Sequence, residues 1–523
     1  MKIVSAKQVK AWLSEKSELA FLDVREFGRY TAGHPFFSVS LPYSIFESRL
    51  MDLVPNLKAP VVVFDDNDGV AELSATRAEL LGFDSIMVLD GGVQAWVDAG
   101  YNLFEGVNLP SKTFGEFLEH ACDTPRISAQ QLYQYQQENK NLKVLDGRPF
   151  TEFRKMSIPG ATSCPNGELA LRYKDLVPDP TTTIVINCAG RTRSILGAQT
   201  LINLDVPNPV LALENGTQGW FLAGLQLDHG KTACYSSELI SEPGLNLQQV
   251  SKTRAQNGGV SFIDAPGLKA LLTCSDQTTY LLDVRTAEEF VRESVGGFLH
   301  APGGQLVQST DSWVAVRGAN LVLIDDEQIR APVTATWLAQ MGHKVFVVTD
   351  GVSGLRTSGF SVERLAPPAL VLPEKITSKE LASQGDCQIL DFRAGMDYRD
   401  AHLEKAQWLT RQGLVKLQVP DGQTLVLISQ DAVRISMANK DILINHPEQK
   451  IYWLAEDESN WREAGLNVIA TPNDPPDHQC IDFNFHTHDR HQGNAQAARD
   501  YLAWEIGLVD QVDEQERAFF RIM

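Results

Sequence analysis

The chain has 523 residues, which is too long for one hydrophobic core and indicates several domains. Its apolar fraction of 43% and charged fraction of 21% are those of an ordinary globular protein. The 46 basic and 66 acidic residues give a net charge of −20, which argues against nucleic acid or a membrane surface as a partner. No segment approaches about 18 unbroken apolar residues and the N-terminus lacks a signal-peptide pattern, so we expect a cytoplasmic protein.

The cysteines point to the same compartment. They are odd in number, form no close pairs, and stand at positions 122, 164, 188, 234, 274, 387 and 480. This scatter predicts mostly buried or incidental thiols in a reducing environment, with neither a disulfide framework nor a zinc knuckle.

One sequence phrase occurs four times along the chain. An apolar strand followed by Asp-x-Arg stands at 21–25, 144–148, 281–285 and 389–393, and each copy continues into a second apolar strand at 61–64, 184–187, 321–324 and 425–428. The spacing from the Asp to the residue after the second strand is 42 positions in three copies and 38 in the fourth. A helical stretch, a third strand and a turn that is rich in glycine in the first two copies follow. The chain is therefore a tandem repeat.

Short apolar strands that alternate with helix-length segments predict βα units on parallel sheets. Each copy has the length of a normal domain, and we place the domains at 1–105, 122–230, 258–366 and 370–470. The polar stretch 231–257 and the proline-rich stretch 364–375 are predicted to be linkers, and 471–523 forms a C-terminal tail. A period of this length indicates domain duplication and excludes a solenoid.

The segment 188–194 of the second copy carries the strongest chemical signal. It reads Cys-Ala-Gly-Arg-Thr-Arg-Ser between the strand 184–187 and a helical pattern that begins at Ile195. Loop N–H groups and the positive end of the helix would then face the Cys188 sulfur, with two arginines nearby, and such surroundings favour the nucleophilic thiolate. Ser194 stands where it could cap the helix. The predicted site is Cys188 as nucleophile, with substrate-binding residues Ala189, Gly190, Arg191, Thr192, Arg193 and Ser194.

The Asp-x-Arg phrase, the strand that ends on Cys188, its six-residue loop and the downstream turn 214–220 resemble the rhodanese homology domain. Residues 1–470 resemble four rhodanese modules in tandem. The resemblance implies small doubly wound α/β modules, without cofactor or metal, whose active cysteine becomes a persulfide. It also implies a sulfurtransferase that moves sulfane sulfur from thiosulfate or a persulfide such as glutathione persulfide to cyanide or a thiol. Arg191 and Arg193 would contact the anionic donor.

Only the second copy has the thiol. The aligned positions are Asp65, Asp325 and Ser429, so we expect the first, third and fourth modules to be inactive. Asp146 and Arg148 recur as a phrase in all four copies, which favours a fold-stabilising ion pair over a catalytic one. Trp220 is predicted to pack in the core at the edge of the loop.

Two other functional classes remain open from the sequence. A non-catalytic scaffold or regulatory sulfur-carrier module is one alternative, because three of the four copies lack the nucleophile. A cysteine-based phosphatase or arsenate reductase is the other, although Arg193 comes five positions after Cys188 and such phosphatases place their arginine six positions after the cysteine.

The tail contains two further features. His486, His488 and His491, together with His478, leave metal binding open, since imidazoles beside carboxylates bind zinc or iron. Residues 495–509 have apolar side chains at helical spacing, which predicts an amphipathic helix. That helix would dock on a neighbouring module or on a second chain, so a homo-oligomer is also open.

Overall fold

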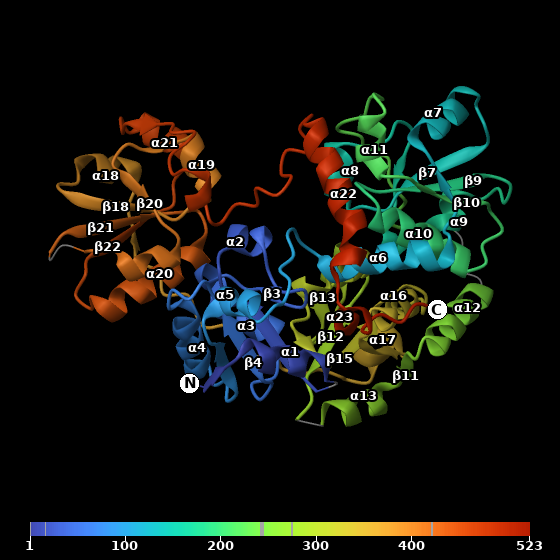
Figure 1. Cartoon of the computed structure of the whole chain (residues 1–523), viewed down its shortest axis with the longest axis horizontal. Helices are drawn as coiled ribbons and strands as arrows, with labels where there is room; N and C mark the ends of the chain where they lie inside the picture. Colours follow the sequence, from blue (N-terminus) through green and yellow to red (C-terminus); the bar gives the residue numbers. More distant parts are fainter. Residues whose placement is uncertain (1, 16, 241–244, 274–275, 420–421) are drawn as a thin grey trace. The chain divides into compact units, whose positions relative to one another are not determined.

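The computed structural model describes the chain except residues 1, 16, 241–244, 274–275 and 420–421. It has two compact units, one formed by residues 1–12, 19–106 and 365–486, the other by 13–18, 107–364 and 487–523 (Figure 1). The first unit contains the first and fourth predicted modules, and the second unit contains the second and third. Cys274 and residues 241–244 of the predicted linker lie outside the described residues.

The first unit contains two parallel sheets. One has the order β1-β5-β4-β2-β3, with strands Lys2–Val4, Ile86–Leu89, Val61–Phe64, Leu19–Asp23 and Val39–Ser40. Its helices are α1 (Ala6–Ser14), α2 (Phe27–Ala32), α3 (Phe46–Leu53), α4 (Val70–Leu80) and α5 (Gly92–Asp98). The other has the order β17-β22-β21-β18-β20, with strands Glu374–Lys375, Ile451–Leu454, Thr424–Ile428, Cys387–Asp391 and Ala406–Trp408. Its helices are α18 (Ser378–Ser383), α19 (Gly395–Asp400), α20 (Ala432–Asn445) and α21 (Glu458–Glu463).

The second unit repeats this architecture. Its first sheet has the order β6-β10-β9-β7-β8, with strands Arg126–Ile127, Val210–Leu213, Thr183–Asn187, Leu142–Asp146 and Thr162–Ser163. Its helices are α6 (Leu109–Cys122), α7 (Ala129–Gln137), α8 (Phe150–Lys155), α9 (Asn166–Leu176), α10 (Thr192–Asn203) and α11 (Gly216–Leu222). We call this part the thiol module.

The second sheet of this unit has the order β11-β16-β15-β12-β13, with strands Ser261–Ile263, Lys344–Val348, Asn320–Ile324, Thr279–Asp283 and Leu299–His300. Its helices are α13 (Ala265–Leu272), α14 (Ala287–Arg292), α15 (Gly303–Gln308), α16 (Arg330–Gln340) and α17 (Gly351–Thr357). We call it the third module. The four sheets share one strand order, which confirms the predicted class of tandem parallel α/β modules.

The central strands have apolar runs such as Val61–Phe64 and Ile184–Ile186, as expected of parallel strands whose two faces are both covered by helices. In the thiol module, Val185 of β9 packs into one core with Phe153 and Trp220. Ile184 and Ile186 point to the opposite face and pack there with Leu169. Successive side chains of a strand alternate between faces, so one apolar run fills two cores.

Part of the linker prediction was wrong. Residues Leu245–Asn257 form a helix, α12, that packs against α16, and Ala255 on its inner face is fully buried. The segment reads Leu-Asn-Leu-Gln-Gln-Val-Ser-Lys-Thr-Arg-Ala-Gln-Asn, with three glutamines and two asparagines, which is why its composition resembled that of a linker.

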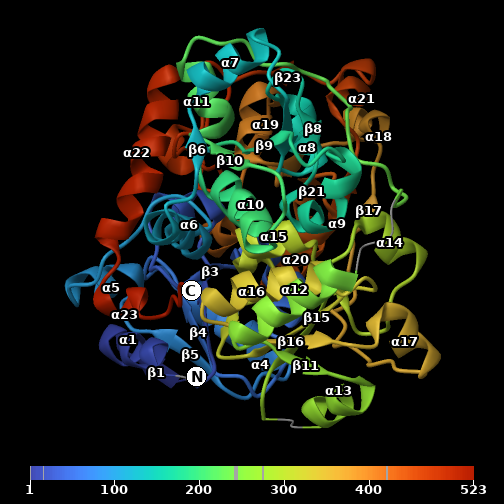
Figure 2. The ribbon, with the colours of Figure 1, turned by 90° about the vertical axis from the view of Figure 1, so that its right-hand side faces the viewer.

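The amphipathic helix predicted in the tail is confirmed. It is α22 (Ala495–Gln511), followed by the short α23 (Glu514–Arg517). Helix α22 packs against α6 and α11 of its own chain, and both views show it beside them (Figures 1 and 2). No helix in the described parts of the chain is long and apolar enough to cross a membrane.

Candidate functional site

Cys188 follows the last residue of β9, at the carboxyl end of the sheet. Strand β9 lies beside β7, and from these two strands the chain continues outward to β10 on one side and β8 on the other. Such a reversal of strand order leaves a crevice at the carboxyl ends, where ligands of open α/β sheets bind. Cys188 is 1% exposed at this point.

The turn before α11 holds the loop that follows Cys188. The Thr217 N–H donates to the carbonyl oxygen of Cys188 at 2.9 Å, and the Gln218 N–H donates to that of Ala189 at 3.1 Å. Gly216 lies in the left-handed region with φ +52°, and a Cβ there would stand 2.2 Å from the Cys188 carbonyl oxygen. Only glycine lets the two loops approach so closely.

The loop leaves several backbone donors without a protein acceptor. Among the described residues, no acceptor receives the N–H groups of Gly190, Arg191 and Arg193. These donors stand at the first turn of α10, where the helix dipole adds positive potential. An anion bound beside Cys188 would accept hydrogen bonds from these donors. A site that stabilises an anion at this position is also one that stabilises a cysteine thiolate.

Ser194 does not cap a helix at Ile195, so that part of the prediction was wrong. Helix α10 already begins at Thr192, and Ser194 therefore lies in its first turn. Its hydroxyl donates to the carbonyl oxygen of Arg191 at 2.9 Å and accepts the Cys188 S–H at 3.4 Å. Ser194 thus contacts the sulfur directly.

The guanidinium of Arg191 is held by helix α6. Its Nε donates to Glu116 at 2.7 Å, its Nη1 to Asn215 at 3.3 Å, and its Nη2 to Glu116 at 2.8 Å and also to Glu119. The predicted contact of Arg191 with substrate stays a prediction. What the structure adds is that Arg191 ties the loop to α6.

Arg193 pairs with Glu152 of α8 through two hydrogen bonds of 2.8 and 2.9 Å. In the third module, the arginine that aligns with Arg193 is Arg330, and it pairs with the aligned Glu289 at 2.7 and 2.8 Å. A pair that recurs in a module with Asp325 in place of the loop cysteine favours a clamp on the loop.

The Asp-x-Arg phrase forms the expected ion pair in all four modules. Asp146 Oδ2 accepts from Arg148 Nη2 at 2.7 Å and from Asn187 Nδ2 at 2.7 Å, which joins the ends of β7 and β9. Trp220 is 1% exposed, packs into the core, and donates its Nε1–H to the carbonyl oxygen of Gln226 at 2.8 Å.

The aligned loops of two other modules are filled by their own carboxylates. Asp65 accepts from the N–H groups of Asn67 and Ala71 at 2.9 and 3.0 Å. Asp325 accepts from those of Ile329 and Arg330 at 3.0 and 2.9 Å. In these modules a fixed side chain takes loop amides that would otherwise be free for an anion.

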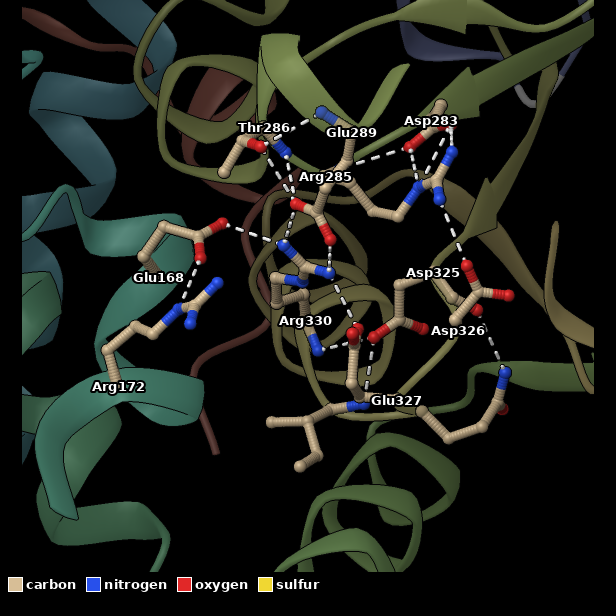
Figure 3. Close-up of polar contacts among 12 residues, drawn as sticks. Glu168, Arg172, Asp283, Arg285, Thr286, Glu289, Asp325, Asp326, Glu327 and Arg330 are labelled. Atoms are coloured by element: carbon tan, nitrogen blue, oxygen red, sulfur yellow. Dashed lines mark hydrogen bonds and ion pairs between the residues drawn. The ribbon is translucent and has the colours of Figure 1, made fainter. Parts of the chain in front are cut away.

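Figure 3 shows the loop of the third module and its surroundings. The guanidinium of Arg330 is fully buried and lies between Glu289, Glu327 at 2.6 Å and Glu168 of α9 at 3.1 Å. The last contact joins the third module to the thiol module. This loop therefore serves packing between modules.

Sequence reasoning missed the tail residues that contact the loop after Cys188. Glu505 of α22 accepts from the Thr192 hydroxyl at 2.5 Å and from its N–H at 3.3 Å, and pairs with Lys112 of α6 at 3.3 Å. Tyr501 accepts from Lys112 as well. Burial acts to raise the pKa of Glu505, but Lys112 and the Thr192 donors hold it below its usual value. Glu505 was missed because a carboxylate does not belong to an apolar helix face.

We expect Glu505→Gln to destabilise the second unit, because it leaves the Lys112 ammonium buried without its counter-charge. Breaking a buried ion pair costs roughly 3–5 kcal/mol. Urea unfolding of the full chain measures the loss. The double variant Lys112→Met with Glu505→Gln removes both charges and should recover most of that stability. Equal losses in the single and double variants would contradict the ion-pair role.

The histidines of the tail divide between the two units. His486 pairs with Glu105 at 3.3 Å in the first unit, and His491 lines a cavity in the second. Within the described ranges, no group of three or more histidine, cysteine, aspartate or glutamate side chains is arranged to hold a metal ion.

Comparison with known proteins agrees with this geometry. The rhodanese-like domain model matches residues 5–99, 128–223 and 264–357, which together exceed half of the chain. The fourth module has the same strand order but lies outside the matched residues. The crystal structure of a thiosulfate sulfurtransferase from Pseudomonas aeruginosa superposes with a TM-score of 0.88 and 36% identity, covering 100% of both chains.

Two sequence relatives match shorter stretches. A putative sulfur carrier protein of Bacillus subtilis is 27% identical over 117 residues, which cover 21% of this chain and 62% of that protein. An HTH-type transcriptional regulator of Mycobacterium tuberculosis is 34% identical over 93 residues, 18% of this chain and 40% of the regulator. The chain thus spans less than two thirds of either relative. On the three matched modules and the structural neighbour, the chain belongs to the rhodanese-like domain family.

Proposed function

We propose that the chain is a sulfurtransferase that carries sulfane sulfur on Cys188. The observation that carries this proposal is the position of that thiol, which follows a buried strand and precedes the first turn of α10. It lies beside loop N–H groups that have no acceptor in the described part of the chain. The aligned positions of the other modules hold Asp65, Asp325 and Ser429, which cannot form a persulfide.

The proposed reaction has two displacement steps. The Cys188 thiolate attacks the outer sulfur of thiosulfate, the S–S bond of thiosulfate breaks, and sulfite leaves with the electron pair. A thiophilic acceptor such as cyanide or a thiol then attacks the outer sulfur of the persulfide and returns Cys188 as thiolate. Both steps shift negative charge between sulfur atoms, so donors preorganised around the loop stabilise them.

The contacts of the loop favour different roles for its arginine side chains and for its backbone N–H groups. Arg191 and Arg193 are bound by carboxylates of α6 and α8, which suits them to hold the loop in shape. The N–H groups of Gly190, Arg191 and Arg193 are then the donors proposed for the sulfur anion. The Ser194 hydroxyl accepts the Cys188 S–H at 3.4 Å. Once that sulfur is a thiolate, the same hydroxyl is proposed to rotate and donate to it.

The test is the intact mass of the full chain after incubation with thiosulfate, before and after cyanide. We expect a gain of one sulfur atom that cyanide removes with formation of thiocyanate. Iodoacetamide added before thiosulfate should block the gain. A chain that gains no sulfur from either thiosulfate or glutathione persulfide would favour the binding-module alternative.

A further inference from the structure

The side chain of Asn166 reaches the loop of Cys188 from the first residue of α9. Its Nδ2 donates to the carbonyl oxygen of Arg193 at 2.8 Å. Its backbone N–H donates at 3.0 Å to the carbonyl oxygen of Gly147, the middle residue of the Asp-x-Arg phrase. Asn166 therefore joins the turn after β7 to the loop after β9.

The oxygen of the same amide is enclosed and unpaired. Asn166 Oδ1 is buried and has no hydrogen-bond partner in the described part of the chain. A Cβ placed on Gly147 would stand 2.0 Å from this oxygen, and one placed on Gly197 would stand 2.7 Å from it. A buried amide oxygen without a partner costs stability, so the contact with Arg193 is kept at a cost.

The other copies have side chains where the thiol module has these two glycines. The middle residue of the Asp-x-Arg phrase is Val24, Val284 or Phe392 in place of Gly147. The position of Gly197, nine residues after the aligned Cys188, is occupied by Ser74, Thr334 and Ala438. The space that the Asn166 amide needs is thus open in the copy that has Cys188.

The two glycines differ in what depends on them. A Cβ on Gly197 would also stand 2.8 Å from Ile186 Cγ2, so that glycine serves core packing as well. For Gly147, the nearest atom outside Asn166 is the carbonyl oxygen of Asn187 at 3.6 Å, which is an ordinary contact. The missing side chain of Gly147 therefore makes room for the amide alone.

The residues aligned with Asn166 have different contacts. The same backbone hydrogen bond to the Asp-x-Arg turn identifies them as Gly303 in the third module and Tyr43 in the first. Gly303 has no side chain, and the Tyr43 hydroxyl donates to Asp441 at 2.8 Å. The corresponding residue of the fourth module is Arg411, which also pairs with Asp441. Within the described residues, the amide contact with the loop thus coincides with the thiol module.

Arg193 is held at two points. Its guanidinium pairs with Glu152, and that clamp has a counterpart at Arg330 of the third module. The Asn166 amide holds the carbonyl, which is bonded to the same Cα as the Arg193 N–H. This N–H is one of the loop donors proposed for the sulfur anion, and rotation of the backbone at this residue would redirect it.

We propose that Asn166 is a positioning residue for the loop of Cys188; this rests on the function proposed above. By holding the Arg193 carbonyl, the amide keeps the Arg193 N–H directed at the sulfur, where it stabilises the thiolate and the persulfide anion. Residue 147 is glycine because the amide occupies the space of its Cβ. Asn166 acts on the sulfur through Arg193.

The test is the pH profile of alkylation by iodoacetamide on the full chain, quantified on the peptide that contains Cys188. Asn166→Ala should move the midpoint up by about one pH unit, because a thiolate stabilised about tenfold less forms at a tenfold lower proton concentration. At a pH below both midpoints, single-turnover loading by thiosulfate should fall about tenfold. Arg191, Arg193 and Glu505 keep their charges in this variant, so the shift reports the hydrogen bonds of the loop.

The matched control is Asn208→Ala in the same module. Asn208 is buried, and its Nδ2 donates to the carbonyl oxygens of Asp179 and Thr182 at 2.9 Å each. It precedes β10 and so lies at the opposite end of the sheet from Cys188. This variant should unfold at lower urea and keep the wild-type midpoint. An equal shift in Asn208→Ala would show a general loosening of the module and overturn the inference.

Gly147→Ala displaces the amide without removing it. The added methyl group should shift the midpoint and slow loading as Asn166→Ala does. Once the amide is gone, the methyl group meets only ordinary contacts, so the double variant should behave as Asn166→Ala alone. Additive effects of the two changes, or an unchanged midpoint in Asn166→Ala, would overturn the inference. Alkylation needs no sulfur donor, so a wild type that gains no sulfur would refute the proposed function and leave this test decisive.

Discussion

Cys188→Ser is expected to reduce sulfur loading and thiocyanate formation to the uncatalysed background while the chain stays folded. A serine hydroxyl at this position keeps the size of the side chain and its contact with Ser194, but it is far less nucleophilic than a thiolate and cannot form a persulfide. Intact mass after thiosulfate and a thiocyanate assay measure the two effects, and circular dichroism checks the fold.

The matched control is Cys164→Ala in the same module. Cys164 is fully buried in the core beneath the sheet, and burial raises its pKa well above the usual value, so its thiol stays protonated. We expect this variant to lose some stability and to load sulfur normally. Sulfur loading on the Cys188→Ser chain, or loss of loading in the Cys164→Ala chain, would contradict the assignment of Cys188 and show that another thiol carries the sulfur.

The sequence was sufficient for the parts of the site that are local in the chain. The apolar run before Cys188 predicted β9, and the polar loop that follows it predicted the strand-to-helix turn, because each depends on neighbouring residues alone. The repeat also contained one longer pair. Glu152 with Arg193 and Glu289 with Arg330 have the same spacing of 41 positions, and this coincidence could have identified the clamp.

The partners of the loop from distant segments could not be predicted in this way. Glu116 lies 75 positions before Arg191, and Glu505 lies 313 positions after Thr192. Nothing in the spacing of one chain shows that α6 and α22 pack beside the same loop. The tail therefore looked like a docking helix without chemistry, whereas its Glu505 pairs with the first residue of α10.

The same limit applies to the modules that lack a cysteine at the loop position. Their loops were expected to be inactive because they lack cysteine. The structure shows in addition that Asp65 and Asp325 accept hydrogen bonds from backbone N–H groups of their own loops, which the alignment alone did not show. Each carboxylate binds the amides of its own loop and so stabilises the turn. In the thiol module, several loop donors have no acceptor among the residues that the structure describes. Arg330 in the loop of the third module pairs with Glu168 of the thiol module and so joins the two modules.

Gly216→Ala is expected to lower the rate of sulfur transfer about a hundredfold, although a glycine has no side chain that could take part in the reaction. A methyl group there would lie 2.2 Å from the Cys188 carbonyl oxygen and 2.9 Å from the Ala189 carbonyl carbon, so the loop that follows Cys188 must move. The positive φ adds strain of about 1–2 kcal/mol. Single-turnover loading by thiosulfate measures the first effect and urea unfolding the second.

Two matched variants separate displacement of the loop from general strain. Gly224→Ala has φ +73° with open space around the added Cβ, so it should lose stability and keep its activity. Gly92→Ala introduces the same clash in the first module, 2.4 Å from the Asp65 carbonyl oxygen at φ +60°. Because that module has no thiol, the variant should unfold more easily and still load sulfur on each folded molecule. If Gly92→Ala loses loading as completely as Gly216→Ala, the effect belongs to the stability of the chain, and the close approach of residue 216 to Cys188 has no special role in the chemistry.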